Sequence, residues 1–162
     1  MYGIVVLIHI VAVLVFIAAH AVSAAAIFQV RAEPDRAKLT HILTRSGTAL
    51  IVAFLALLVV LVAGIILGFM GGWWGRLWIW ASLVVFVGVT LAMTPFAANP
   101  MRAVRTALGM QMGKPKEGEP AAVPPGDAEL AAARAALRPE LAAGVGVAGL
   151  ILLFWLMLAK PF

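Results

Sequence analysis

Four long runs of apolar residues, none of which contains Asp, Glu, Lys or Arg, constrain the fold of this chain more than any other feature. They cover residues 3–28, 47–72, 77–96 and 141–159. A hydrocarbon core of about 30 Å is crossed by about 20 residues of α-helix. Because backbone amides in lipid must find partners within their own segment, each run is expected to be a helix. The sequence therefore predicts an all-α, polytopic membrane protein, a bundle of four transmembrane helices.

The composition excludes a water-soluble fold. Of the 162 residues, 64% are hydrophobic and only 12% are charged, and the mean hydropathy of +1.08 lies far above that of a soluble domain. Disorder over most of the chain is excluded because it requires low hydrophobicity and high charge. The chain has no cysteine. Disulfides, thiolate metal sites, iron–sulfur clusters and covalently attached c-type haem are therefore excluded as well.

The net charge of +5 indicates membrane topology rather than nucleic acid binding, because the basic residues gather in two segments between the apolar runs. Ten of the 12 Lys and Arg residues lie in residues 29–46 and 97–140, and the other two are Arg76 and Lys160. Loops rich in basic residues remain in the cytoplasm. We therefore expect both loops to be cytoplasmic, both termini to be outside, and no nucleic acid partner.

Aromatic residues and composition refine the expected location. Six aromatic side chains near the outer ends of the spans are expected to form an interfacial belt: Tyr2, Trp73, Trp74, Trp78, Trp80 and Trp155. Arg outnumbers Lys, and Ala and Gly are abundant, which is typical of a GC-rich bacterial genome. The expected location is the bacterial plasma (inner) membrane, where the lipid bilayer surrounds the chain.

The connections between the spans are unequal, and residues 1–162 are interpreted as a single membrane domain. A glycine-rich turn joins spans two and three, which predicts an antiparallel hairpin of helices. Asn99 followed by Pro100 is typical of a helix cap and first turn. The apolar residues after them recur at helical spacing: Met101, Val104, Leu108 and Met112. We therefore expect a short amphipathic helix that lies on the membrane surface.

The rest of the second long loop has two parts. Residues 113–126 contain four prolines and several charges, a composition that predicts a linker. Asp127 is expected to cap an alanine-rich helix that extends to Arg138. Pro139 is expected to begin the fourth span, because proline suits the first turn of a helix.

Small residues predict where the spans pack closely. Gly64 and Gly68 have GxxxG spacing, and Gly144, Gly146 and Gly149 crowd the start of the fourth span. Such positions let helix backbones approach each other in lipid. With four spans in one chain, we expect these surfaces to be used inside the bundle, and a homo-oligomer is the alternative.

Two histidines distinguish the first span. His9 and His20 are eleven residues apart, and steps of about 100° per residue return them to one face with an axial offset of roughly 16 Å. Tyr2, Phe16 and Ser23 share this face, because positions 2, 9, 16 and 23 form a heptad row. Polar groups turned towards lipid would lack partners. We therefore expect this face to line the interior of the bundle.

These histidines are the candidate ligands for a metal or cofactor. Neutral imidazole binds the iron of haem b, and four-helix bundles hold cofactors between their helices. We interpret His9 as the preferred ligand, and His20 with Met93 as a second candidate pair, since Met93 lies at a comparable depth on span three. The alternatives stay open: each histidine makes only an interhelical hydrogen bond or contacts a substrate or quinone, and Met93 only packs.

The segment LIHIVA at residues 7–12 places a histidine early in the first of four helices, and in this it resembles a group of bacterial membrane proteins. The group includes HemJ-type protoporphyrinogen oxidases, the CopD copper-resistance domain and four-helix families of unknown function, of which the last are nearest. In the HemJ-like branch the first-helix histidine is associated with haem b, so the resemblance implies haem binding at His9. The charged residues of the catalytic HemJ pattern find no match in the spans, which favours cofactor binding over enzymatic activity.

Two functions therefore follow from the sequence: a haem-binding or redox-associated module, and a non-catalytic accessory or assembly subunit of a larger membrane complex. A small carrier is disfavoured because no span contains an acidic or basic residue. No nucleotide loop, nucleophile elbow or metalloprotease motif is present, so no catalytic residue is assigned. His41 is interpreted as a surface residue, and the methionines are too scattered to indicate a copper relay.

Overall fold

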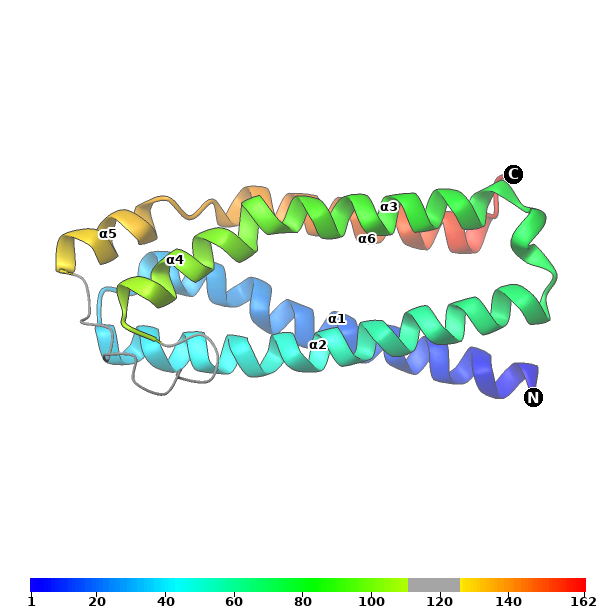
Figure 1. Ribbon diagram of the computed structural model, residues 1–162, viewed down its shortest axis with the longest axis horizontal. Coiled ribbons are helices and arrows are strands. Elements are labelled where there is room, and N and C mark those ends of the chain that lie inside the picture. The colour runs from blue at the N-terminus through cyan, green and yellow to red at the C-terminus, as the bar shows by residue number, and fades with distance from the viewer. Residues whose placement is uncertain (111–125) are drawn as a thin grey trace, which may run out of the picture.

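The computed structural model describes residues 1–110 and 126–162, and every regular element within these ranges is a helix (Figure 1). Four helical stretches are long and apolar enough to cross a membrane: Tyr2–Ala32, Arg36–Met70, Leu77–Ala107 and Asp127–Ala159. The predicted all-α bundle with four transmembrane helices is confirmed. The linker predicted at 113–126 lies outside the described residues, apart from Gly126.

The long helices form two antiparallel pairs (Figure 1). In chain order the elements are α1 (Tyr2–Ala32), α2 (Arg36–Met70), η1 (Trp73–Gly75), α3 (Leu77–Met93), η2 (Thr94–Ala98), α4 (Asn99–Ala107), α5 (Asp127–Ala135) and α6 (Pro139–Ala159). Helix α1 packs along α2, and α3 packs along α6. Contacts of α1 with α6 and with α5 join the two pairs.

The two ends of the bundle differ in composition. Both termini and the turn between α2 and α3 lie at one end (Figure 1). The tryptophans belong to this turn, to the first turns of α3 and to the last turns of α6, so we call it the tryptophan end. The opposite end holds α4, α5 and the connection between α1 and α2, and we call it the basic end. That the basic end faces the cytoplasm stays a prediction.

Helices α1 and α2 are separated by residues 33–35 alone. The Asp35 side chain accepts a hydrogen bond of 2.9 Å from the Lys38 backbone nitrogen and so caps the start of α2. Because of this cap, α2 begins eleven residues before its apolar run. The extra turns give the basic end a helical scaffold beyond the apolar span.

Pro95 modifies the third long helix without ending it. Proline has no amide hydrogen to donate, and the chain forms the π-helical turn η2 before it continues as α4. Asn99 has helical backbone angles, and no side chain caps α4. The prediction that Asn99 caps a separate helix was therefore wrong.

Helix α4 packs against protein and not along the membrane surface. Its residues Met101, Val104 and Ala107 are buried in one cluster with side chains of α1, α2 and α5. The predicted helical spacing is confirmed for Met101 and Val104, whereas Leu108 follows the last residue of α4 and Met112 lies outside the described residues. The predicted surface position was wrong, because the extended part of α2 and the end of α1 cover the apolar face of α4.

Helix α5 also differs at both ends from the prediction. Asp127 is its first residue, and Gly126 occupies the cap position with no side-chain hydrogen bond. The helix ends at Ala135, short of Arg138. Arg138 precedes Pro139, and a residue before proline is disfavoured in the helical conformation, so its backbone turns (φ −122°, ψ 72°) before α6 begins. Pro139 starts α6 as predicted.

The main hydrophobic core lies at the basic end. It is formed by residues from α1, α2, α4, α5, the segment between α5 and α6, and the start of α6: Ala26, Ile27, Val30, Leu39, Leu43, Met101, Val104, Ala107, Leu130, Leu137 and Ala142. Val30, Leu39, Leu43 and Val104 have no exposed surface. Towards the tryptophan end, most large apolar side chains of α1 and α2 are exposed, as expected of surfaces that face lipid.

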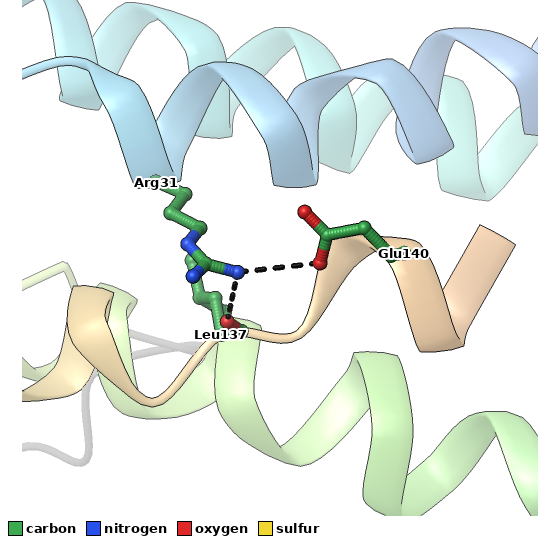
Figure 2. A network of polar contacts seen from close by, with 3 residues as sticks. All are labelled: Arg31, Leu137 and Glu140. Carbon is green, nitrogen blue, oxygen red and sulfur yellow. Dashed lines mark hydrogen bonds and ion pairs between the residues drawn. The ribbon is translucent and has the colours of Figure 1, made fainter.

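Two arginines join α1 to the second helix pair at the basic end. Arg134 of α5 donates to the backbone oxygens of Val30 and Arg31, at 3.0 and 3.1 Å. These are carbonyls of the last turn of α1, which have no partner within the helix. Arg31 in turn donates to the Leu137 backbone oxygen at 3.1 Å and to Glu140 at 3.3 Å (Figure 2). We call this set of contacts the arginine clamp.

Helices α3 and α6 pack closely at Gly149. This glycine is buried, and a Cβ atom added to it would lie 2.5 Å from Cγ2 of Val89 on α3. Gly144, on the same helix, has open space around the corresponding position. Close approach of the two backbones therefore depends on Gly149 and not on Gly144.

We expect Gly149→Ala to destabilise the protein by about 1–3 kcal/mol, because the added methyl group overpacks the contact with Val89. Gly144→Ala is the matched control and should change stability by less than about 1 kcal/mol. SDS titration of the protein in mixed micelles measures both. Equal effects of the two substitutions would show that α3 and α6 do not meet at Gly149.

Candidate functional site

The polar face of α1 turns towards the other helices. Ser23 is buried, and His9 and His20 are half-buried. Tyr2 is 44% exposed, but its ring lies edge-on to Trp73 with the centroids 6.4 Å apart. The inward orientation predicted from the heptad row is therefore found at the positions that carry the imidazoles.

A buried hydrogen bond supports this orientation of α1 about its axis. The hydroxyl oxygens of Ser23 on α1 and Ser46 on α2 are 3.0 Å apart. Ser46 is 1% exposed, so in this environment each hydroxyl depends on the other for a side-chain partner. The bond fixes the face of α1 that contacts α2.

His9 lies in a notch that Gly64 leaves in α2. Its Cε1 and Nδ1 atoms are 3.4 and 3.7 Å from the position of a Cβ on Gly64. The ring is next to the backbone of Val60, one turn away. Within the described chain, Nδ1 of His9 is buried and forms no hydrogen bond. The imidazole is thus enclosed between α1 and α2, and the Val60 backbone is the polar group beside it.

Gly68 forms the next notch, and Trp74 fills it. The Nε1 and Cε2 atoms of Trp74 are both 3.1 Å from the position of a Cβ on Gly68. Nε1 of Trp74, like Nδ1 of His9, is buried and forms no hydrogen bond among the described residues. The GxxxG pair is therefore used inside the chain, as predicted, and it brings two ring nitrogens to adjacent turns of α2.

His20 and Met93 come together at α6. The Nε2 atom of His20 is 3.9 Å from the position of a Cβ on Gly146, and Cε of Met93 is 3.8 Å from the same point. The His20 ring is stacked on Phe16, with centroids 5.4 Å apart and planes 18° apart. One imidazole from the first helix pair and one thioether from the second therefore meet at a glycine. We call these four residues the His20 site.

The structure separates the two histidines. His9 contacts α2, whereas His20 faces α6 and α3. His41 is exposed on α2 at the basic end, as predicted. The sequence identified His20 and Met93 as a pair, but Gly146 was interpreted only as a packing residue and Phe16 only as a neighbour in the heptad row. The position of Phe16 one turn before His20 is the signal from which the ring stacking could have been inferred.

The donor set of the His20 site restricts which metal centre it fits. In residues 1–110 and 126–162, no three His, Cys, Asp or Glu side chains are placed to hold a metal ion together. A metal site built from three or more such side chains is therefore not found in these ranges. A porphyrin would bring four nitrogen ligands of its own, so one imidazole and one thioether would be enough to hold its iron from the protein.

Comparisons with known proteins add no relative: no family model, no curated protein and no solved structure matches the chain.

We expect the Ser23–Ser46 bond to be measurable in a double-mutant cycle. Ser23→Ala and Ser46→Ala should each destabilise the protein, with a coupling of about 0.6 kcal/mol and at most about 1.7 kcal/mol, the range of hydrogen bonds between membrane helices. Ser82→Ala is the matched control, because the Ser82 hydroxyl bonds within its own helix, to the Trp78 oxygen. Strictly additive effects of Ser23→Ala and Ser46→Ala would contradict a bond between α1 and α2.

Proposed function

We propose that this protein is a membrane-embedded haem b module that takes part in electron transfer, with His20 and Met93 as the iron ligands. The observation that carries the proposal is the convergence of the His20 imidazole and the Met93 thioether at Gly146. His9 remains the alternative ligand. Its ring is enclosed against Gly64, roughly 16 Å along α1 from His20, so it would serve as a ligand only at a separate site.

The ligand types support an electron-transfer role. Histidine with methionine is an axial pair that holds haem iron in cytochromes and favours the reduced state. If His20 and Met93 held a haem, it would supply one-electron chemistry, and the two protein ligands would leave its iron no open position for a substrate. Covalent attachment is excluded because the chain has no cysteine. These features favour a non-covalent b-type haem and a redox role over catalysis.

The surrounding residues have defined tasks in this proposal. Phe16 stacks on the His20 ring and fixes its orientation. Gly146 leaves the space beside both ligand groups that a larger side chain would fill. Met93 is the last residue of α3, directly before the π-helical turn around Pro95. Each ligand thus belongs to a different helix pair, and haem would join the two pairs.

The proposal places the protein in a bacterial inner membrane and relates it to HemJ-type proteins. The four apolar helices support a multi-pass membrane protein, and the charge asymmetry and composition support the inner membrane of a bacterium with the basic end in the cytoplasm. The likeness to HemJ-type proteins supports haem binding by the first helix. In this protein we assign the ligand to His20, where the HemJ-like pattern would place it at His9.

An absorption spectrum of the protein purified from haem-replete cells tests the proposal. We expect a Soret band that is lost in His20→Ala, because the variant removes the nitrogen ligand. In Met93→Leu the band should remain but shift, and the reduction potential should fall, because a thioether raises the potential of haem iron. His41→Ala, a substitution of an exposed histidine, is the control and should leave the spectrum unchanged.

Two results would contradict the assignment. A colourless preparation would exclude haem under these conditions, whatever the fold. A Soret band that persists in His20→Ala and disappears in His9→Ala would retain haem binding but assign it to the notch at Gly64. Reconstitution with hemin tests whether a variant can still bind haem. Circular dichroism tests whether it has folded, because a folded variant keeps its helical spectrum.

The alternative is an accessory or assembly subunit of a larger membrane complex. The loose contact between the helix pairs favours it, because most large apolar side chains of α1 and α2 towards the tryptophan end are exposed. A partner helix would cover such a face. Native mass spectrometry in mild detergent is expected to show a defined complex in this case, and a protein that runs only as a monomer would contradict it.

A further inference from the structure

A small pocket lies at the tryptophan end, far from the His20 site. It has a volume of about 200 Å³ and is lined by Trp73, Arg76, Trp78, Lys160 and Phe162. Its walls come from the turn after α2, the start of α3 and the tail after α6. Segments from the beginning and end of the second helix pair therefore meet there.

The backbone of the tail is held in place at this pocket. Lys160 has a left-handed conformation, with φ 44° and ψ 56°, and ends α6. This conformation is uncommon for a residue with a side chain. It turns the last residues towards α3, where the Phe162 backbone oxygen accepts a hydrogen bond of 3.3 Å from the Trp78 nitrogen. The pocket is thus closed on one side by a fixed tail.

Aromatic rings position the Lys160 ammonium. Its Nζ atom lies 4.6 Å from the ring centroid of Trp73 and 5.7 Å from that of Trp78. The two indole rings are themselves in contact, with centroids 5.7 Å apart, and Trp78 is buried. An ammonium on ring faces keeps hydrogens that can be donated to an anion. The rings therefore orient a cation without neutralising it.

In the part of the chain that the structure describes, no Asp or Glu side chain balances the positive charge of Arg76 and Lys160 at this end. Neither Arg76 nor Lys160 forms an ion pair within the described residues. The sequence has no Asp or Glu in residues 1–32, 46–99 or 141–162, so every acidic side chain of the chain lies outside these three ranges. Helix α3 also starts beside Arg76 without a side-chain cap, and its dipole adds positive potential there.

We propose that this pocket binds the phosphate of an anionic phospholipid headgroup. Arg76 and Lys160 supply the two cations, and Trp73 and Trp78 form the wall that positions Lys160. A phosphate diester carries a negative charge that the two cations attract, and both arginine and lysine bind phosphate oxygens. A lipid is assigned in preference to a soluble anion because tryptophans mark the depth of the headgroups and exposed Leu77 and Phe162 adjoin the pocket.

Fluorescence quenching tests the proposal in the complete protein. All five tryptophans lie at the tryptophan end, so lipid bound at the basic end does not contribute to the signal. The protein is reconstituted in phosphatidylcholine vesicles with a small fraction of phosphatidylglycerol, and the brominated form of one lipid or the other acts as quencher. We expect brominated phosphatidylglycerol to quench far more at equal fraction, because it is enriched in the pocket.

Charge-matched variants separate the pocket from the overall charge of the protein. The preference for phosphatidylglycerol should fall about 30-fold in R76Q/K160Q and about fivefold in R76Q alone. The R76Q variant changes an exposed side chain and should leave the fold intact. The control R45Q/R102Q removes the same two charges from exposed positions at the basic end and should keep the preference.

Three results would overturn the proposal. Equal quenching by both brominated lipids would show no selectivity. An equal loss in R45Q/R102Q would show an effect of net charge without a site. Displacement of phosphatidylglycerol by millimolar inorganic phosphate at constant ionic strength would assign the pocket to a soluble anion instead of a lipid.

Discussion

The arginine clamp and the hydrophobic core beside it join the two helix pairs at the basic end. Arg134 satisfies the last carbonyls of α1, and Arg31 binds the segment between α5 and α6. Elsewhere the pairs touch mainly where α1 crosses α6. Because α1 is a single rigid helix from Tyr2 to Ala32, fixing its end also fixes the direction of its side chains deeper in the bundle. The approach of His20 to α6 therefore depends on hydrogen bonds formed several turns away.

Within the bundle, glycines decide which side chains can occupy the interior. Gly64 and Gly68 of α2 admit the rings of His9 and Trp74, and Gly146 of α6 adjoins His20 and Met93. Gly47 does the same at the basic end: it makes room for Arg105, which donates to the Leu43 backbone oxygen at 2.9 Å. In lipid there is no hydrophobic force between helices, so close contact and polar pairing must hold them together. These glycines allow close contact and leave room for the polar side chains beside them.

The sequence predicted the four spans and the inward face of α1, because both follow from properties of single segments: length, apolarity and periodicity. The sequence did not predict the features that depend on contacts between segments. Asn99 and Pro100 have the local preference of a helix start, yet burial of Met101 and Val104 keeps the chain helical through η2. His20 and Met93 could be considered together because the sequence places them at similar depths in their spans. Their convergence could not be predicted, because it requires knowing which faces α3 and α6 turn towards α1.

The pairing of α3 with α6 has a consequence for biogenesis. Helices α1 and α2 are consecutive and can associate as a hairpin as soon as both have left the ribosome. Helix α3 packs mainly on α6, which begins at Pro139, long after α3 ends at Met93. During synthesis α3 is therefore inserted into the bilayer without its partner, with the Val89 surface in contact with lipid. Completion of the second pair is therefore a step that follows translation of the last helix.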